Sequence, residues 1–374
     1  MNVLAVNAGG VTLELAVVDA DATVVTERLV DPWDGRDTSP ITDIARECRI
    51  DAVGHRVVHG GTHVEAQRID DVLVADLDDA ASLAPVHQGR TLLAIRAARS
   101  AIDRVPHVAC FDTTFHLTLP AAAATYPLPR EWRHRWALRR VGFHGLSHAY
   151  VARRAADLAG SHPSRRIVSC HLGSGASVCA IEAGRSIDTT MGMTPMEGLM
   201  MVTRSGTIDP GLLLWLLDGG GLTVEEVSEG LNTRSGLAGI AGGSGDMRDV
   251  VHRRARSDPE ATLAFDIYVH RLRQGIAAMA ASLGGVDVLA FTGGVGQHMA
   301  EVRAVTVAGL AHLGLAVDHD RNRGTSDDAD ISARDAPARC VVVATGEHHS
   351  IAAETRRVLG RSTTPERNPH AADP

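Results

Sequence analysis

The chain has 374 residues, of which 44% are hydrophobic and 22% charged, a balance typical of a globular protein with two or three domains. Its 37 basic residues against 45 acidic ones give a formal net charge of −8, which argues against nucleic acid as a partner. Every basic residue is arginine, so the lysine-dependent P-loop, protein-kinase and Schiff-base chemistries are excluded. No apolar run approaches the ~20 residues of a membrane span, and the N-terminal sequence lacks the features of a signal peptide. We therefore expect no membrane partner and a cytoplasmic location.

The first predicted element is a β-hairpin over residues 3–19 (VLAVNAGGVTLELAVVD), with a glycine turn between two apolar strands. Residues 167–184 (IVSCHLGSGASVCAIEAG) repeat this pattern. At an offset of 164 residues the two copies align Asn7 with His171, Gly9 with Gly173 and Leu15 with Cys179. We interpret the repeat as the start of two similar α/β domains.

Two motifs after the first hairpin join an apolar strand to a polar side chain. Residues 54–61 (GHRVVHGG) place Arg56 on a strand that ends in a glycine pair. Its planar guanidinium suits a carboxylate or phosphate, and a surface ion pair is the alternative. Residues 109–116 (ACFDTTFH) place Asp112 just past a strand, where open α/β sheets bind ligands. A helix-capping aspartate is the alternative there.

Residues 141–148 (VGFHGLSH) set His144 between phenylalanine and glycine, which suits a ligand cleft, although structural histidines are commoner. His144 and His148 are four residues apart, so both could face one side of a helix as zinc ligands. With 19 histidines in the chain such pairs arise by chance, and neither an HExxH motif nor a CxxC pair is present. A zinc site is therefore a weak hypothesis.

The second half of the chain adds glycine-rich turns. Residues 201–210 (MVTRSGTIDP) place Arg204 in a turn before a helix, and residues 236–249 (GLAGIAGGSGDMRD) could wrap a ligand or act as a linker. Residues 288–310 are read as a strand, a glycine turn and a helix, an arrangement that can bring backbone N–H groups to a phosphate. Apolar spacings predict helices over 89–103, 144–158 and 259–283, an amphipathic helix over 130–140, a surface loop over 318–337 and a tail over 361–374. Strands that alternate with helices indicate an α/β protein.

Taken in chain order, these segments resemble the acetate kinase family of the acetate and sugar kinase/Hsp70/actin superfamily. The motifs that carry the resemblance are GHRVVHGG, LAPVH (83–87), FDTTFH, RRVGFHGLSH, HLGSGAS, TTMGMTPMEGL, TRSGTIDP, DMRD and FTGGVG. The resemblance runs from residue 3 to residue 356, and nine motifs in family order are far more specific than one.

The resemblance implies an α/β fold of two duplicated ribonuclease-H-like (actin-like ATPase) domains that flank a central cleft. Residues 1–114 plus 347–374 would form the first domain, to which the C-terminal helix returns, and residues 115–346 the second, with the nucleotide site. The implied activity is reversible, Mg²⁺-dependent transfer of the γ-phosphoryl group of ATP to a short-chain carboxylate such as acetate or propionate. Such chemistry needs in-line positioning and charge neutralisation. A homodimer is also implied.

The resemblance assigns roles to residues as well. Arg56 and Arg204 would bind the carboxylate and phosphoryl oxygens, and His144 would donate to the transferring phosphoryl group. Asn7 and Glu347 would position Mg²⁺, and the fourth catalytic residue, Asp112, would hold Mg²⁺ or the attacking carboxylate. The substrate-binding residues would be Arg56, Val58, Val86, His87, Phe143 and Pro195. The nucleotide-binding residues would be Thr12, Glu14, His171, Leu172, Gly173, Ser174, Gly175, Asp246, Met247, Arg248, Gly294, Val295, Gly296, Gln297 and His298.

The first phosphate loop departs from the family pattern N-x-G-S-S-S-x-K. Residues 7–14 read NAGGVTLE, so Thr12 keeps one hydroxyl and Glu14 replaces a cation. We expect an arginine to pair with Glu14, because a lone buried carboxylate is costly. The family's HLGNG and GIGEN are HLGSG and GVGQH here. These departures leave open a different carboxylate or phosphoryl donor, or a sensor of nucleotide or acyl phosphate, and a histidine-rich metallohydrolase is a further alternative.

Overall fold

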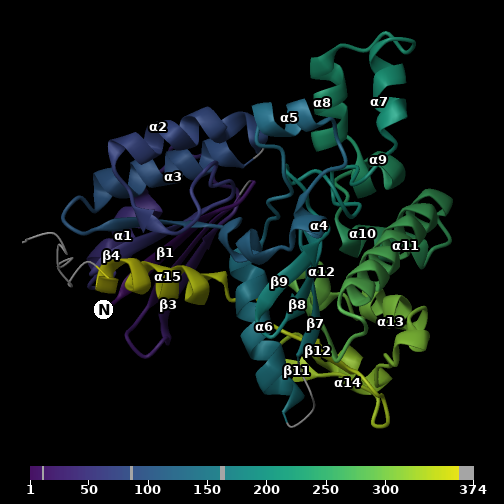
Figure 1. Cartoon of the computed structure of the whole chain (residues 1–374). Helices are drawn as coiled ribbons and strands as arrows, with labels where there is room; N and C mark the ends of the chain where they lie inside the picture. Colours follow the sequence, from purple (N-terminus) through teal and green to yellow (C-terminus); the bar gives the residue numbers. More distant parts are fainter. Residues whose placement is uncertain (11, 85–86, 161–164, 362–374) are drawn as a thin grey trace, which may run out of the picture. The chain divides into compact units, whose positions relative to one another are not determined.

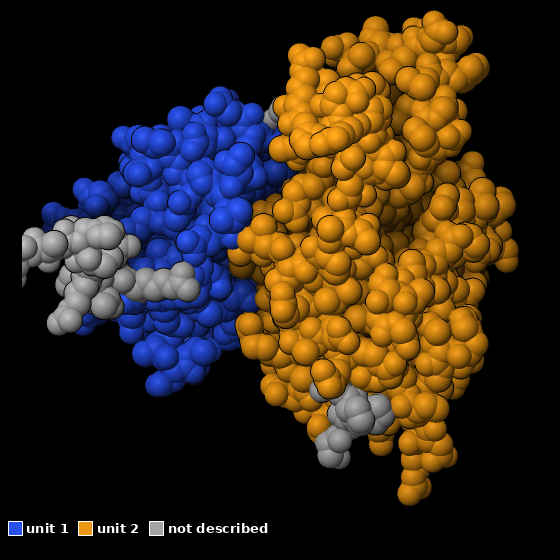
Figure 2. Space-filling model, in the orientation of Figure 1, with its two compact units in different colours: residues 1–111, 347–374 blue, residues 112–346 orange. Residues whose placement is uncertain are grey.

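The computed structural model describes residues 1–10, 12–84, 87–160 and 165–361. They form two compact units, residues 1–111 with 347–374 (unit 1) and residues 112–346 (unit 2), which Figure 2 shows in separate colours. The boundaries between the units therefore fall at 111/112 and 346/347, where the sequence placed them at 114/115 and 346/347. Among the described residues, no helix is long and apolar enough to cross a membrane.

Unit 1 is built on a six-stranded sheet of order β3-β2-β1-β4-β6-β5. The strands are β1 (Val3–Ala8), β2 (Leu13–Val18), β3 (Val24–Val30), β4 (Ala52–Val57), β5 (Gln67–Arg68) and β6 (His107–Phe111). The first three form an antiparallel meander, β1, β4 and β6 run parallel, and β5 closes the edge antiparallel to β6.

The two faces of this sheet are covered by different helices, because side chains alternate along a strand. Leu4 and Val6 point to one face and pack with residues of α1 (Ser39–Glu47) and α3 (Gln88–Ala101), beside which α2 (Asp71–Asp79) lies. Val3 points to the other face and packs against α15 (Glu347–Arg361), drawn in yellow in Figure 1. Asn7 is four residues from Val3, so it also lies on the α15 face.

Gly54 on β4 shows how closely α15 approaches the sheet. A β-carbon at this position would lie 2.3 Å from Thr355 Oγ1 and 2.6 Å from a side-chain carbon of Ile351, both on α15. Because Arg56 is two residues farther along β4, its side chain leaves the sheet on the same face. The glycine thus lets the helix dock beside the strand that carries Arg56.

Unit 2 repeats this sheet, with the order β11-β12-β10-β7-β8-β9. Its strands are β7 (Arg166–Leu172), β8 (Ala176–Glu182), β9 (Arg185–Thr189), β10 (Val288–Thr292), β11 (Ala329–Asp330) and β12 (Arg339–Val342). An antiparallel meander again precedes three parallel strands and an antiparallel edge strand. The duplicated α/β fold predicted from the hairpin repeat is therefore confirmed.

The helices of unit 2 also divide between the two faces of its sheet. Helix α6 (Gly145–Ala159) packs on the face to which Ile167 and Cys179 point, and α11 (Pro259–Ser282) packs near Val178 on the other face. The remaining helices are α4 (Ala121–Ala124), α5 (Arg130–Arg135), α7 (Pro210–Leu217), α8 (Val224–Thr233), α9 (Gly236–Ala241), α10 (Met247–Arg254), α12 (Gly293–His298), α13 (Ala300–Ala308) and α14 (His319–Gly324).

Three local predictions need correction. The hairpins align at the predicted offset in β1 and β7 but slip by one residue in the second strand, because β8 pairs one residue earlier; Ala16, not Leu15, is the counterpart of Cys179. The segment 318–337 is not a plain loop, since it contains α14, β11 and the buried Ile331. Helix α5 spans only Arg130–Arg135 and buries none of its residues. The tail from residue 362 lies outside the described residues.

Candidate active site

In unit 1, four polar side chains meet on the α15 face at the carboxyl ends of β1 and β4. Asn7 Nδ2 donates to Glu14 at 3.0 Å and to Glu347 at 2.9 Å, and Asn7 Oδ1 accepts from Arg56 at 3.0 Å. Glu14 is directly opposite Asn7 in the β1–β2 ladder, whereas Glu347 begins α15. The cluster therefore combines two carboxylates, an amide and a guanidinium.

Glu14 does not have the ion pair that the sequence led us to expect. Within the described part of the chain, its carboxylate accepts from Asn7 and has no arginine nitrogen within 4 Å, so the pairing prediction is wrong. Desolvation is the main cause that raises the pKa of Glu14 to about 7, and the charge of Glu347 acts in the same direction. Arg56 opposes the rise electrostatically. The side chain still keeps solvent-exposed surface.

The other residues predicted in unit 1 lie at the turn before β2, at the start of α3 and just after β4. The turn before β2 is closed by a hydrogen bond of 2.8 Å from Gly9 N to the carbonyl of Thr12. His87 precedes α3 and lies beside the same turn, 3.7 Å from the position of a β-carbon at Gly10. Val58 is buried just after β4. Val86 lies outside the described residues.

In unit 2, the N-terminus of α6 carries Phe143, buried, and His144, which adopts a left-handed conformation (φ 55°). Gly145 N donates to the carbonyl of Asp112 at 2.9 Å, and a β-carbon at Gly145 would lie 2.1 Å from that oxygen. Only glycine allows this approach. The side chain of Asp112 is fully buried.

Gly175, in the turn between β7 and β8, marks the point where the catalytic candidates of unit 2 come together. A β-carbon there would lie 2.5 Å from Arg204 Nη2 and 3.3 Å from His144 Nε2. The rings of His144 and His171 are stacked with centroids 4.2 Å apart. Arg204 is buried and donates through Nη1 to the carbonyl of Pro195. The structure thus brings two imidazoles and a guanidinium to one glycine turn.

Two further loops of unit 2 adjoin this turn. Val202 N donates to the carbonyl of Ser174 at 3.3 Å. Gly293 (φ 79°) begins α12, and a β-carbon there would lie 2.7 Å from the backbone of Leu172, so β7 and α12 touch through their backbones. Gly294 and His298 are exposed, Val295 is half-buried and Gly296 is buried.

Some of the predicted nucleotide residues offer little side-chain surface. Leu172 and Met247 are buried, and the amide of Gln297 donates to the carbonyl of Ser326 and accepts from Thr345 N at 3.4 Å. Asp246 caps α10 and forms an exposed ion pair with Arg248 at 2.6 Å. The hydrogen bonds from Arg248 lower the pKa of Asp246.

Three buried serines, Ser147, Ser169 and Ser177, were not among the predicted site residues. Ser147 Oγ is 2.8 Å from His171 Nδ1, and Ser177 Oγ is 2.9 Å from both His144 Nδ1 and His148 Nε2. The i, i+4 spacing of His144 and His148 thus places both imidazole rings within hydrogen-bond distance of one hydroxyl, that of Ser177. A signal was present, because Ser169, His171 and Ser177 are polar residues at alternate positions of strands that are otherwise apolar.

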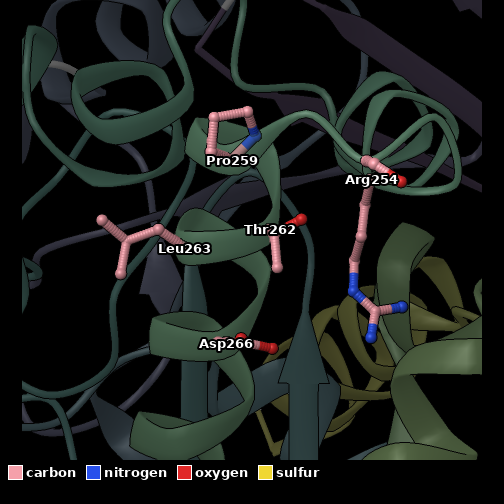
Figure 3. Close-up of a pocket in the computed structure, with 6 residues that line it drawn as sticks. Arg254, Pro259, Thr262, Leu263 and Asp266 are labelled. Atoms are coloured by element: carbon pink, nitrogen blue, oxygen red, sulfur yellow. The ribbon is translucent and has the colours of Figure 1, made fainter.

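One pocket of unit 2 lies where α10 leads into α11 (Figure 3). Its lining residues are Arg254, Ser257, Pro259, Thr262, Leu263 and Asp266. Arg254 is ion-paired with Glu301 and its guanidinium lies 4.3 Å from the centroid of Phe265. None of the site residues predicted from the sequence lines this pocket, and we assign no ligand to it.

Comparison with known proteins gives a consistent result. The model of the acetokinase family matches residues 38–353. The chain is similar to the acetate kinase of Gloeobacter violaceus, with 47% identity over 321 residues, 85% of this chain and 79% of the relative. It is also similar to the acetate kinase of Nostoc punctiforme, with 44% identity over 357 residues, 94% of this chain and 86% of the relative.

Solved structures agree with the sequence comparison. The propionate kinase of Francisella tularensis matches with a TM-score of 0.86 and 32% identity, over 96% of this chain and 99% of that one. The acetate kinase of Porphyromonas gingivalis matches with a TM-score of 0.83 and 32% identity, over the same shares of the two chains.

Proposed function

The chain belongs to the acetokinase family and is a kinase that acts on a carboxylate with ATP as co-substrate, and we propose that it phosphorylates a short acid such as acetate or propionate. A carboxylate oxygen attacks the γ-phosphorus in line while the bond to the departing ADP oxygen breaks, so the products are an acyl phosphate and ADP. The reaction is reversible. Membership of this family does not favour a sensor or a metallohydrolase.

The observation that best supports this proposal is the meeting of His144, His171 and Arg204 at the Gly175 turn. Phosphoryl transfer spreads negative charge over the equatorial oxygens, and preorganised donors stabilise that charge. Arg204 supplies a fixed positive charge and His144 an imidazole N–H. Asp112, buried next to the N-terminus of α6, completes the proposed set in unit 2.

Unit 1 supplies the residues for Mg²⁺ and for a further positive charge. The residues present fit a hard cation by their chemistry, because Mg²⁺ prefers oxygen ligands. Glu347 offers a carboxylate beside the Asn7 amide nitrogen, and Asn7 offers an amide oxygen, which accepts from Arg56 in this structure. Asn7 and Glu347 would hold Mg²⁺, which when bound neutralises part of the charge on the nucleotide phosphates. Arg56, hydrogen-bonded to Asn7, would bind the carboxylate or the phosphoryl group.

The remaining proposed contacts set the substrate size and hold the nucleotide. Apolar side chains of Val58, Val86, Phe143 and Pro195 would surround the acyl chain, and His87 would adjoin it. The small volume of the pocket that these side chains would form favours acids of two to four carbons, and each methylene changes binding by ~1–3 kcal/mol. The nucleotide would bind along residues 171–175, 246–248 and 294–298, with Thr12 and Glu14 near its phosphates.

Hydroxamate trapping of acyl phosphate tests this function. Purified protein is incubated with acetate, propionate or butyrate, each with ATP, GTP or pyrophosphate, in the presence of Mg²⁺. We expect acyl hydroxamate with ATP and at least one of the acids, and loss of the product when Mg²⁺ is chelated. Folded protein that forms no acyl phosphate from any acid would contradict the proposal.

A cytoplasmic location and a homodimer are also part of the proposal. Support for the dimer comes from the family resemblance and from α7, whose Leu214 and Trp215 are 70% and 59% exposed. A helix that exposes several large apolar side chains is typical of a surface covered by a protein partner. Light scattering of the wild type and of Trp215→Glu tests this: we expect a dimer and a monomer, and a wild-type monomer would contradict it.

A further inference from the structure

A line of buried hydrogen bonds leads from His144 back into the sheet of unit 2. Ser177 Oγ is 2.9 Å from His144 Nδ1 and 2.9 Å from His148 Nε2, and His148 Nδ1 is 2.9 Å from Ser169 Oγ. His148, Ser169 and Ser177 have no solvent-exposed surface. Ser169 and Ser177 come from the neighbouring strands β7 and β8, whereas His148 lies in α6 and His144 caps its N-terminus, so the line depends on the docking of α6 on the sheet.

The hydrogens along this line must all point the same way. A serine hydroxyl has one hydrogen to donate, and a neutral imidazole has one N–H and one acceptor nitrogen. His148 is neutral, because burial, together with nearby His116 and His171, holds its pKa well below the usual value. Ser177 therefore donates to one of the two histidines and accepts from the other.

In a neutral His144 ring, only one direction leaves an N–H at the outer nitrogen. In that direction Ser169 donates to His148 Nδ1, His148 Nε2 donates to Ser177, and Ser177 donates to His144 Nδ1, so the hydrogen of His144 is on Nε2. Nε2 is the nitrogen that lies beside the Gly175 turn. The opposite direction would place a lone pair there, which would repel an anionic oxygen.

We propose that Ser177 is a positioning residue that, backed by His148 and Ser169, holds His144 in the tautomer with its hydrogen on Nε2. This inference rests on the proposed function, in which a phosphoryl oxygen faces His144. Ionised phosphoryl oxygens accept hydrogen bonds and do not donate them, so a bound, ionised phosphoryl oxygen stabilises this direction of the line. Because Ser177 fixes the tautomer in advance, the His144 ring does not have to change its tautomer during transfer.

The same hydrogen bonds explain why the polar side chain of Ser177 is buried. Ser177 lies opposite His171 in the β7–β8 ladder, on the face covered by α6. Its hydroxyl satisfies ring nitrogens of two histidines at once, which removes the cost of burying two unpaired polar atoms. A structural role alone would be met by either direction of the line, whereas the proposed role requires one of them.

Kinetics of three variants test the proposal. Ser177→Ala removes the donor to His144 Nδ1, and we expect kcat to fall about 10- to 100-fold, as for other residues that orient a functional imidazole, with the KM values nearly unchanged. Ser177→Thr keeps the hydroxyl and should recover most of kcat. Ser186→Ala is the matched control, because Ser186 is also buried and hydrogen-bonded to a histidine, His116, that is not part of the line.

The tautomer of His144 can be measured by NMR in the absence of turnover. In protein labelled with ¹⁵N-histidine, long-range ¹H–¹⁵N correlations distinguish a protonated Nε2 from a protonated Nδ1, and His144→Gln assigns the signal. With ADP, Mg²⁺ and inorganic phosphate bound, we expect hydrogen on Nε2 of His144. Hydrogen on Nδ1, or a Ser177→Ala variant that folds and keeps full kcat, would overturn the inference. If the wild type made no acyl phosphate, the proposed function would be contradicted. The NMR measurement of the His144 tautomer would still test this inference separately.

Discussion

The two hairpins that begin the two units have the same strand pairing but opposite chemistry at equivalent positions. In unit 1, Asn7 faces Glu14 across the ladder and joins two carboxylates to Arg56. In unit 2, His171 faces Ser177, and the neighbouring groups are imidazoles and hydroxyls, among which burial holds the pKa of His148 well below its usual value. The duplicated fold thus provides two equivalent positions, one that carries carboxylates and a guanidinium and one that carries imidazoles and hydroxyls.

The difference shows how one scaffold can divide the work of phosphoryl transfer. In each unit a single helix, α15 or α6, covers the face on which the network lies. A network with charged groups suits a cation and phosphates, whereas buried hydroxyls and imidazoles can orient hydrogen-bond donors. We therefore expect substitution of Glu14 in the unit 1 hairpin to act on binding of the Mg²⁺–nucleotide complex, and substitution of Ser177 in the unit 2 hairpin to act on the transfer step.

The largest expected effect comes from removing the fixed positive charges. Arg204→Ala and Arg56→Ala should each lower kcat/KM ~100- to 1000-fold, the usual loss when one preorganised donor of ~3–4 kcal/mol is removed. Arg323→Ala, at an exposed position of α14, is the control and should keep wild-type kinetics. Near-normal kinetics in Arg204→Ala with an unchanged melting temperature would contradict the assignment.

The next largest effect concerns acid stability, and it tests the burial of His116 in unit 2. Burial lowers the pKa of His116 to about 4. Below pH 6.5 the unfolded chain binds a proton at His116 that the folded chain does not bind, so this group alone lowers the free energy of unfolding by ~1.4 kcal/mol per pH unit down to about pH 4, or ~3 kcal/mol in total. Urea titrations from pH 7 to 4 measure this slope, and His116→Gln should reduce it by one proton. An equal slope in both proteins would show that His116 is not buried as described.

A smaller effect is expected from the glycine turn of unit 2. Gly175→Ala would bring a β-carbon to 2.5 Å from Arg204 Nη2 and must displace that side chain. We expect kcat to fall about 10-fold or more, corresponding to ~1.4 kcal/mol per factor of ten. Gly230→Ala, in α8 of the same unit, is the control, because a β-carbon there would meet no described atom within 4 Å. Equal losses in the two variants would mean that the turn does not act through Arg204.

The smallest expected effect concerns Glu14 in unit 1 and its influence on nucleotide binding. Glu14→Gln removes a carboxylate beside the residues proposed for Mg²⁺ and phosphate, and at pH 8 the KM for MgATP should fall about fivefold, since one such charge at 4 Å in water is worth ~1 kcal/mol. Glu47→Gln, at an exposed ion pair of the same unit, is the control. An increase in KM would show that Glu14 assists nucleotide binding.

Much of the fold could be predicted from the sequence, because its signals are local. The hairpin repeat of residues 3–19 and 167–184, and the apolar spacing of the three longer helices, depend on periodicity alone. The one-residue slip between the copies could not be seen, since register is set by the length of the turn and by cross-strand packing. Helix α14 was missed because its polar sequence lacks an apolar stripe.

The candidate site was predictable as a set of residues but not as networks. Motifs indicated Arg56, His144 and Arg204, whereas the partners of Glu14 and the role of Ser177 depend on contacts between segments far apart in the chain. Glu14 was expected to pair with an arginine on grounds of charge. In the structure the amide of Asn7 takes that place, because Asn7 is the residue directly opposite Glu14 in the ladder.

Steady-state kinetics of Glu14→Gln and Ser177→Ala, measured side by side with varied MgATP at saturating carboxylate, test the division of work between the two hairpins most directly. The account predicts that Glu14→Gln changes the KM for MgATP with kcat nearly unchanged, and that Ser177→Ala lowers kcat with that KM nearly unchanged. If both variants moved the same parameter, the two hairpins would not have separate roles and the account would be contradicted.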